Sequence, residues 1–103
     1  MEKLSVIVPC FNEQETLQDY YDAISKVRET LLGKECELQV ILVDDGSKDK
    51  TLAKMKELSG QCSWIRYISF TRNFGKEAAI YAGLNNARGD YVVIMDADMQ
   101  DPP

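Results

Sequence analysis

The chain has 103 residues, of which 45% are hydrophobic and 28% charged, as in an ordinary globular domain rather than a disordered segment. Its formal net charge is −5, which argues against non-specific binding to nucleic acid or to anionic lipid. The sequence contains no His and three widely spaced Cys, which excludes a His-based acid–base centre and argues against a zinc site or a disulfide framework.

Strand and helix patterns alternate along the whole chain. In order they predict a strand at 4–9, a helix at 12–33, a strand at 38–43, a helix ending at Gly60, a strand at 64–70, a helix at 75–87 and a strand at 91–95. Asn12 and Glu15 have the spacing of a capping box for the first helix, and Ser47 or Asp49 can cap the second. The strands are almost wholly apolar, which indicates burial on both faces.

This order of elements predicts an α/β fold. We expect an open parallel sheet with helices on both faces, joined by right-handed crossovers. Four strands make a small sheet for this class, and the chain ends directly after its most polar segment. We therefore expect residues 1–103 to form a single domain that is truncated at its C-terminal end.

Polar and charged residues follow each of the four predicted strands. They lie in the segments 9–13, 44–47, 71–76 and 96–100. In an open parallel sheet, ligands bind outside the carboxyl ends of the strands, where the strand order reverses. The sequence therefore predicts a ligand site at this edge of the sheet.

The segment after the last strand carries candidate metal ligands. Asp98 and Gln100 stand two residues apart, just after Asp96, and alternate side chains of an extended chain share a face. Their oxygen atoms suit a hard cation such as Mg²⁺ or Mn²⁺. The alternative is a solvated acidic loop.

Two other charged pairs have a functional and a structural interpretation. Asp44 and Asp45 can accept hydrogen bonds from a base or a ribose, or can form an Asp-Gly turn. Arg72 and Lys76, at the start of a helix, can bind phosphate or pair with a nearby Asp.

The aromatic and thiol groups are ambiguous in the same way. Phe11 and Phe74 can stack on a base or cover the sheet edge, and we expect Phe74 to be core cover. Cys10, Cys36 and Cys62 have no His or second Cys nearby in the sequence, so we expect inert packing residues.

Four ordered blocks span nearly the whole chain. They are Val8-Pro9-x-Phe11-Asn12-Glu13, Val43-Asp44-Asp45-Gly46-Ser47-x-Asp49, Arg72-Asn73-Phe74-Gly75-Lys76 and Asp96-Ala97-Asp98-Met99-Gln100-Asp101-Pro102-Pro103. Together they resemble the family 2 glycosyltransferases of the GT-A fold. The last two blocks are most similar to the branch that glycosylates polyprenyl phosphates, which includes dolichol-phosphate mannose synthase and bactoprenol-phosphate glucosyltransferases. The resemblance implies the N-terminal, nucleotide-binding half of a GT-A domain.

The resemblance also implies a binding site for a nucleotide-diphospho-sugar, either a UDP-sugar or a GDP-sugar. Pro9, Phe11 and Glu13 would line the nucleotide pocket. Val43 and Asp45 would contact the base, with Asp45 as its polar partner.

The remaining donor contacts implied by the resemblance come from the last block. Asp96, Ala97 and Asp98 would bind the ribose–diphosphate part of the donor. Asp98 and Gln100 would hold Mg²⁺ or Mn²⁺ between the two phosphates, where the ion neutralises the leaving group.

In the implied reaction, an oxygen of polyprenyl phosphate attacks the anomeric carbon and displaces the nucleoside diphosphate. Arg72 and Lys76 would lie near the diphosphate or an adjoining carboxylate. The acceptor-side carboxylate is expected beyond Pro103, so we expect the chain alone to be inactive. The parent protein would act at the cytoplasmic face of a membrane.

Several other interpretations stay open. A polysaccharide or another soluble molecule is the alternative acceptor. A receiver-like domain, phosphorylated on Asp96, would need an acidic pair after its first strand and a Lys after a fifth strand. The third interpretation is a binding module without catalytic activity. An uncovered strand edge would in addition favour self-association of the chain.

Overall fold

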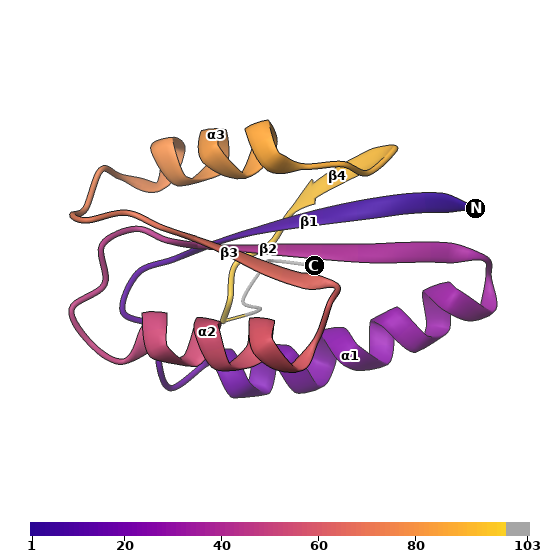
Figure 1. The fold of residues 1–103 in the computed structure, drawn as a ribbon, viewed down its shortest axis with the longest axis horizontal. Helices are drawn as coiled ribbons and strands as arrows, with labels where there is room; N and C mark the ends of the chain where they lie inside the picture. The colour runs from indigo at the N-terminus through magenta and orange to yellow at the C-terminus, as the bar shows by residue number, and fades with distance from the viewer. Residues whose placement is uncertain (99–103) are drawn as a thin grey trace.

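The computed structural model describes residues 1–98 and shows a four-stranded parallel sheet between two layers of helices (Figure 1). The strand order is β3-β2-β1-β4. Helices α1 and α2 cover one face, and α3 covers the other. The predicted α/β class is thereby confirmed. The elements are β1 (Glu2–Cys10), α1 (Leu17–Gly33), β2 (Cys36–Asp44), α2 (Thr51–Gln61), β3 (Ile65–Ser69), α3 (Lys76–Asn86) and β4 (Tyr91–Ile94).

The two central strands are buried on both faces because their side chains alternate between two hydrophobic clusters. The larger cluster lies between the sheet and the helices α1 and α2; it includes Val6, Val8, Val40, Leu42, Leu17, Tyr20, Ile24, Met55 and Leu58. The smaller one lies under α3 and consists of Ile7, Ile41, Val43 and Ala79. Each fully buried aliphatic side chain contributes about 1.5–3 kcal/mol, so β1 and β2 form the stable centre of the fold.

Helix α3 lies close to the sheet because it presents small residues to it. Ala79 and Gly83 are buried, and a Cβ on Gly83 would stand 2.4 Å from Cγ2 of Ile7. Ile7 is itself fully buried, so its side chain has no open space into which it can move. The sequence signal of a helix rich in Ala and Gly is explained by this contact.

The predicted capping box of the first helix is wrong. Asn12 has a φ of 54°, and α1 begins only at Leu17, after Thr16. The carbonyl of Glu13 accepts the N–H groups of Thr16 and Leu17, both at 3.1 Å. The chain thus makes an additional turn between β1 and α1, which holds residues 11–16 at the edge of the sheet.

Neither Ser47 nor Asp49 is the N-cap residue of α2 as predicted; that residue is Lys50, which makes no side-chain cap. The Asp49 carboxylate accepts the N–H of Thr51, the first residue of α2, at 2.9 Å. Ser47 has another role, because its hydroxyl accepts the N–H of Asn12 at 2.8 Å. The two side chains therefore bind different segments of backbone: Asp49 binds the start of α2, and Ser47 binds the loop after β1.

Strand β4 is exposed, although the apolar sequence predicted a buried strand. Tyr91, Val92, Val93 and Ile94 are between 41% and 58% exposed. Helix α3 packs against β1 and β2, and within residues 1–98 no element covers the outer side of β4. Apolar composition indicates which residues favour burial but not whether a neighbouring layer is present to bury them.

The start of β4 is fixed by a buried polar network on β1 and β2. The hydroxyl of Ser5 donates to Gln39 Oε1 at 2.7 Å and accepts the N–H of Gly89 at 2.8 Å. A Cβ on Gly89 would stand 2.6 Å from the Ser5 backbone nitrogen, so only glycine allows this approach. Asp90 also donates its N–H to the carbonyl of Lys3 at 2.7 Å, which sets the register of β4 beside β1.

The strand order excludes the receiver-like interpretation. Receiver domains have the order 2-1-3-4-5, in which the third strand lies beside the first. Here β1 pairs with β2 and β4, and β3 lies at the edge beyond β2.

The packing of α3 yields a stability prediction. Gly83→Ala should lower the free energy of unfolding by about 1–3 kcal/mol, because the new methyl group collides with buried Ile7. Gly60→Ala in α2 is the matched control: nothing lies within 4 Å of its Cβ position, so stability should rise by about 0.4–1 kcal/mol. Urea unfolding followed by circular dichroism measures both. An unchanged or raised stability of the Gly83 variant would contradict the close packing.

Candidate functional site

A pocket of about 250 Å³ opens at the carboxyl end of the sheet, between β1 and β4. It lies where the strand order reverses: the chain moves outward from β1 to β2 and β3, and then crosses to the opposite side of β1 to form β4. Adjacent loops diverge at such a point and leave a crevice, which is the usual ligand site of open α/β sheets. A pocket thus lies at the edge of the sheet where the sequence predicted a ligand site.

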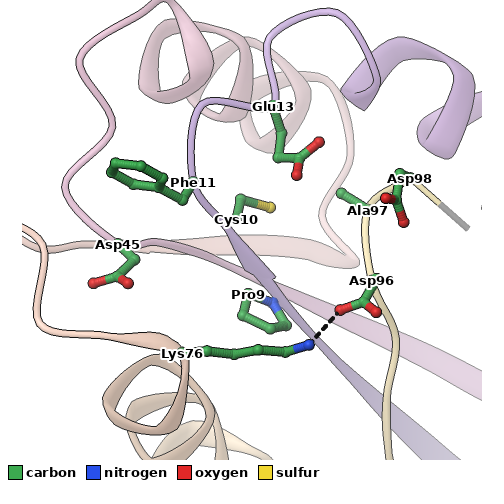
Figure 2. Close-up of a pocket in the computed structure, with 9 residues that line it drawn as sticks. All are labelled: Pro9, Cys10, Phe11, Glu13, Asp45, Lys76, Asp96, Ala97 and Asp98. Carbon is green, nitrogen blue, oxygen red and sulfur yellow. Dashed lines mark hydrogen bonds and ion pairs between the residues drawn. The ribbon is translucent and has the colours of Figure 1, made fainter. Parts of the chain in front are cut away.

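Figure 2 shows the nine residues that line the pocket, drawn from all four strand ends or the elements that follow them. Eight of them were predicted as site residues: Pro9, Phe11, Glu13, Asp45, Lys76, Asp96, Ala97 and Asp98. They come from positions as far apart in the sequence as 9 and 98. The parallel sheet brings them together because it gathers all its carboxyl ends at one edge.

An ion pair crosses the pocket from α3 to the segment after β4. The Lys76 ammonium lies 2.9 Å from Asp96 Oδ1 (Figure 2). Both side chains are substantially exposed, at 60% and 40%, so water screens the pair and its contribution to stability is small. The sequence left phosphate binding and pairing with a carboxylate open for Lys76, and the structure shows the second.

The two adjacent carboxylates of Asp44 and Asp45 are both buried and have different partners. Asp44 Oδ1 accepts the N–H of Ser47, three residues on, at 2.9 Å, so this side chain closes the turn after β2. The Asp45 carboxylate instead accepts the N–H groups of Phe74 and Gly75. One carboxylate shapes its own turn, and the other holds the loop of the next strand.

Within residues 1–98, two predicted site residues, Val43 and Arg72, are not among those that line the pocket. The side chain of Val43 is fully buried under α3 with Ile7 and Ile41. The Arg72 guanidinium lies 4.8 Å from the ring centroid of Phe74. Gln100, the second predicted metal ligand, lies outside the described residues.

Phe74 is not the core residue that we expected. It is 54% exposed, and its ring meets the edge of Phe70 with a centroid separation of 5.6 Å. The ring is therefore held between Phe70 and the Arg72 guanidinium at the surface, beside the segment that reaches Lys76.

Cys10 lines the pocket, although its sequence context predicted only inert packing. It is the last residue of β1, and this position at a strand end was the available sequence signal. Burial, followed by the nearby carboxylates of Glu13, Asp44 and Asp96, raises the pKa of its thiol well above the ordinary value. The thiol therefore stays protonated, and its expected inertness is supported.

The pocket lining has the chemistry of a hard-cation site. Four acidic residues line the pocket together with one Lys, namely Glu13, Asp45, Asp96 and Asp98 with Lys76. Oxygen donors of this kind fit Mg²⁺ or Mn²⁺, whereas within residues 1–98 no set of three or more carboxylate or thiol groups is close enough to hold an ion by itself. An ion bound in this pocket would therefore need further oxygen ligands.

An acidic pocket does not attract a bare polyphosphate, but it can take a polyphosphate that shares a divalent cation with the protein. The exposed ring of Phe11 adds an apolar surface on which a base could stack. The combination of carboxylates, an ammonium group and an aromatic ring suits a nucleotide diphosphate with its metal ion.

The fold and the position of the pocket define an α/β domain of the GT-A type. The chain belongs to glycosyl transferase family 2, whose family model matches residues 5–103. The bactoprenol glucosyl transferase of Shigella phage SfV is 41% identical over 100 residues, which are 97% of this chain and 32% of that protein. The prophage bactoprenol glucosyl transferase homolog of Escherichia coli K12 is 40% identical, with the same coverage. The chain thus spans about a third of the length of these relatives.

Solved structures agree with this assignment. The mannosyltransferase PcManGT from Pyrobaculum calidifontis, in complex with GDP-Man and Mn²⁺, has a TM-score of 0.78 and 28% identity, over 94% of this chain and 28% of its own. Staphylococcus aureus TarS 1-349 in complex with UDP has a TM-score of 0.76 and 25% identity, over 93% and 27%. The sheet described here is the N-terminal half of a GT-A domain.

The burial of Cys10 yields a prediction about thiol reactivity. At pH 8, Cys10 should react with iodoacetamide at least about tenfold more slowly than Cys36, because the Cys10 pKa is raised by burial and the half-buried Cys36 is accessible. Mass spectrometry of the alkylated peptides measures both rates, and the urea-unfolded chain is the control, in which the rates should converge. Equal rates in the folded chain would contradict the protected position of Cys10.

Proposed function

We propose that this chain forms the donor-binding part of a glycosyltransferase that transfers a sugar from a nucleotide diphosphate to a polyprenyl phosphate. The observation that carries the proposal is the acidic pocket at the switch point between β1 and β4, with Phe11 at its rim and Lys76 across from Asp96. Membership of family 2 supports the same activity.

The donor would lie along the edge of the sheet. Phe11, Pro9 and Glu13 would contact the nucleoside, and the base would lie near Asp45 and the end of β2 at Val43. The ribose and diphosphate would extend toward Asp96, Ala97 and Asp98. UDP- and GDP-sugars are both candidates, since the solved neighbours named above hold UDP in one case and GDP-Man in the other.

Mg²⁺ or Mn²⁺ would be held by Asp98 and Gln100 in this proposal, and a bound ion neutralises the charge that develops on the leaving diphosphate. The Mn²⁺ in the PcManGT complex supports a divalent ion. Lys76 and, farther out, Arg72 would supply positive charge near the same phosphates.

The acceptor proposal rests on the relatives whose names include bactoprenol glucosyl transferase. The attacking group would be a phosphate oxygen, which is already ionised and needs little assistance from a base. A soluble acceptor, such as a polysaccharide, is the second candidate, and no residue of the pocket distinguishes it from the lipid.

A lipid acceptor would bring the parent protein to the cytoplasmic face of a membrane. Within residues 1–98, the helices are too short or too polar to cross a bilayer.

Calorimetric titration with UDP and with GDP, each with MnCl₂ or with EDTA, tests the donor site. We expect one nucleotide to bind in a metal-dependent manner, and Asp98→Ala to weaken that binding by about tenfold or more, because a cation ligand is lost. Asp19→Ala, an exposed carboxylate in the first turn of α1, is the matched control and should leave the affinity unchanged. Equal nucleotide affinity with MnCl₂ and with EDTA would contradict a metal-dependent site. Unchanged affinity of Asp98→Ala would contradict the role of Asp98 as a cation ligand.

We also propose that the exposed strand β4 allows the chain to self-associate. Within residues 1–98, β4 has exposed apolar side chains and lies at the edge of the sheet, and natural proteins usually cover such features. Light scattering after size exclusion should show a dimer or larger species, and Val93→Lys should shift it toward the monomer. A monodisperse monomer of the unchanged chain at high concentration would contradict this proposal.

A further inference from the structure

The buried carboxylate of Asp45 is bound by the loop that precedes α3. It accepts the N–H of Phe74 at 2.8 Å, the N–H of Gly75 at 3.1 and 3.2 Å, and the side-chain amide of Asn73 at 3.0 Å. The same Asn73 amide lies 3.1 Å from the Asp45 carbonyl. These donors replace the water that a carboxylate loses on burial, so the loop and the carboxylate depend on each other.

The two loops also touch through their backbones. Gly46 follows Asp45 with a φ of +74°, and a Cβ at this position would stand 2.2 Å from the Arg72 carbonyl carbon and 2.4 Å from the Asn73 nitrogen. The turn after β2 is thus pressed against the loop after β3. The contact leaves little room for the loop to shift while Asp45 holds it.

The loop held by Asp45 leads directly to Lys76. Gly75, with a φ of +103°, is the N-cap residue of α3 and makes no side-chain cap of its own. The carboxylate that accepts its N–H is that of Asp45, in the turn after β2. Lys76 is the first residue of α3, and its ammonium lies 2.9 Å from Asp96. Figure 2 shows Asp45, Lys76 and Asp96 around the same pocket.

We infer that Asp45 is a positioning residue for Lys76: its carboxylate fixes residues 73–75 and so sets where the Lys76 ammonium meets the phosphates of a bound donor. The inference rests on the proposed function for the identity of the ligand, but the state of the loop can be measured without any ligand. Asp45 thus has two proposed roles: a contact with the base of the donor, and the positioning of Lys76, which does not involve the base.

A ligand without a base separates the two roles. Inorganic pyrophosphate with Mg²⁺ offers phosphates to Lys76 but nothing to a base-binding group. If Asp45 acts through Lys76, Asp45→Asn should weaken pyrophosphate binding by about fivefold, and should add nothing in a Lys76→Met background. Asparagine keeps the shape of the side chain but replaces one acceptor oxygen with an NH₂ group that faces other donors.

The experiment combines two measurements on the ligand-free and pyrophosphate-bound chain. Amide hydrogen exchange by NMR should show Phe74 and Gly75 exchanging about tenfold faster in Asp45→Asn. Calorimetry with Mg²⁺ and pyrophosphate should show that Asp45→Asn weakens pyrophosphate binding in the unchanged chain but not in the Lys76→Met background. Asp49→Asn is the matched control: Asp49 also accepts backbone N–H groups beside a helix start, but lies outside the pocket lining, so pyrophosphate affinity should not change.

Each result decides the inference. If the amide hydrogen exchange of Phe74 and Gly75 is unchanged in Asp45→Asn, the positioning role is overturned. It is also overturned if Asp45→Asn loses UDP or GDP affinity but keeps its pyrophosphate affinity, because Asp45 would then serve the base alone. If the unchanged chain binds neither nucleotide nor pyrophosphate, the proposed function fails. In that case the acylation rate of the Lys76 amine decides: faster acylation in Asp45→Asn supports the positioning role, and an unchanged rate overturns it. If Asp45→Asn does not fold, Asn73→Ala, at an exposed residue, replaces it in the same measurements.

Discussion

The reversal of strand order at β1 is the constraint on which the rest of the structure depends. Helices α1 and α2 lie on one face and carry the chain outward to β2 and β3, whereas α3 lies on the other face and carries it back past β1 to β4 (Figure 1). Because each crossover is right-handed, a reversal of strand order places the helices on opposite faces of the sheet, and both faces of β1 and β2 are covered. The same reversal separates the loops after β1 and β4, and the pocket lies in the space between them.

The strand-end loops around this pocket are joined by hydrogen bonds to backbone groups. The loop after β1 is tied to the start of α2, because Glu13 donates its N–H to Thr51 Oγ1 at 2.8 Å and Lys48 donates its N–H to Asn12 Oδ1 at 2.9 Å. The turn after β2 is tied to the loop after β3 through Asp45. Backbone donors are fixed by the chain itself, so these connections need little side-chain ordering and hold three of the loops as one unit.

The fourth loop is connected differently. An ion pair between Lys76 and Asp96 joins α3 to the segment after β4. The pair is partly exposed, so it is weaker than a buried network of hydrogen bonds. A bound cation and phosphate would compete for both groups of this pair. The pocket thus has a rigid side, formed by the ends of β1, β2 and β3, and a side at β4 whose charged groups can exchange partners when a ligand enters.

The sequence by itself determined the order of the elements and the α/β class, because apolar period is a local property. Strand-end polarity indicated the segments that meet at the pocket, and the resemblance to family 2 supplied the individual residues, eight of which line it. The sequence could not determine which side chains those polar residues would bind. Asp45 holds a loop 28 to 30 positions away, Cys10 enters the pocket lining, and Val43 and Arg72 lie outside it. It also predicted burial for β4, since composition reports the preference of a strand and not the presence of a covering layer. Tertiary structure decided these points because partner choice and burial depend on elements far apart in the chain that come together only when the sheet forms.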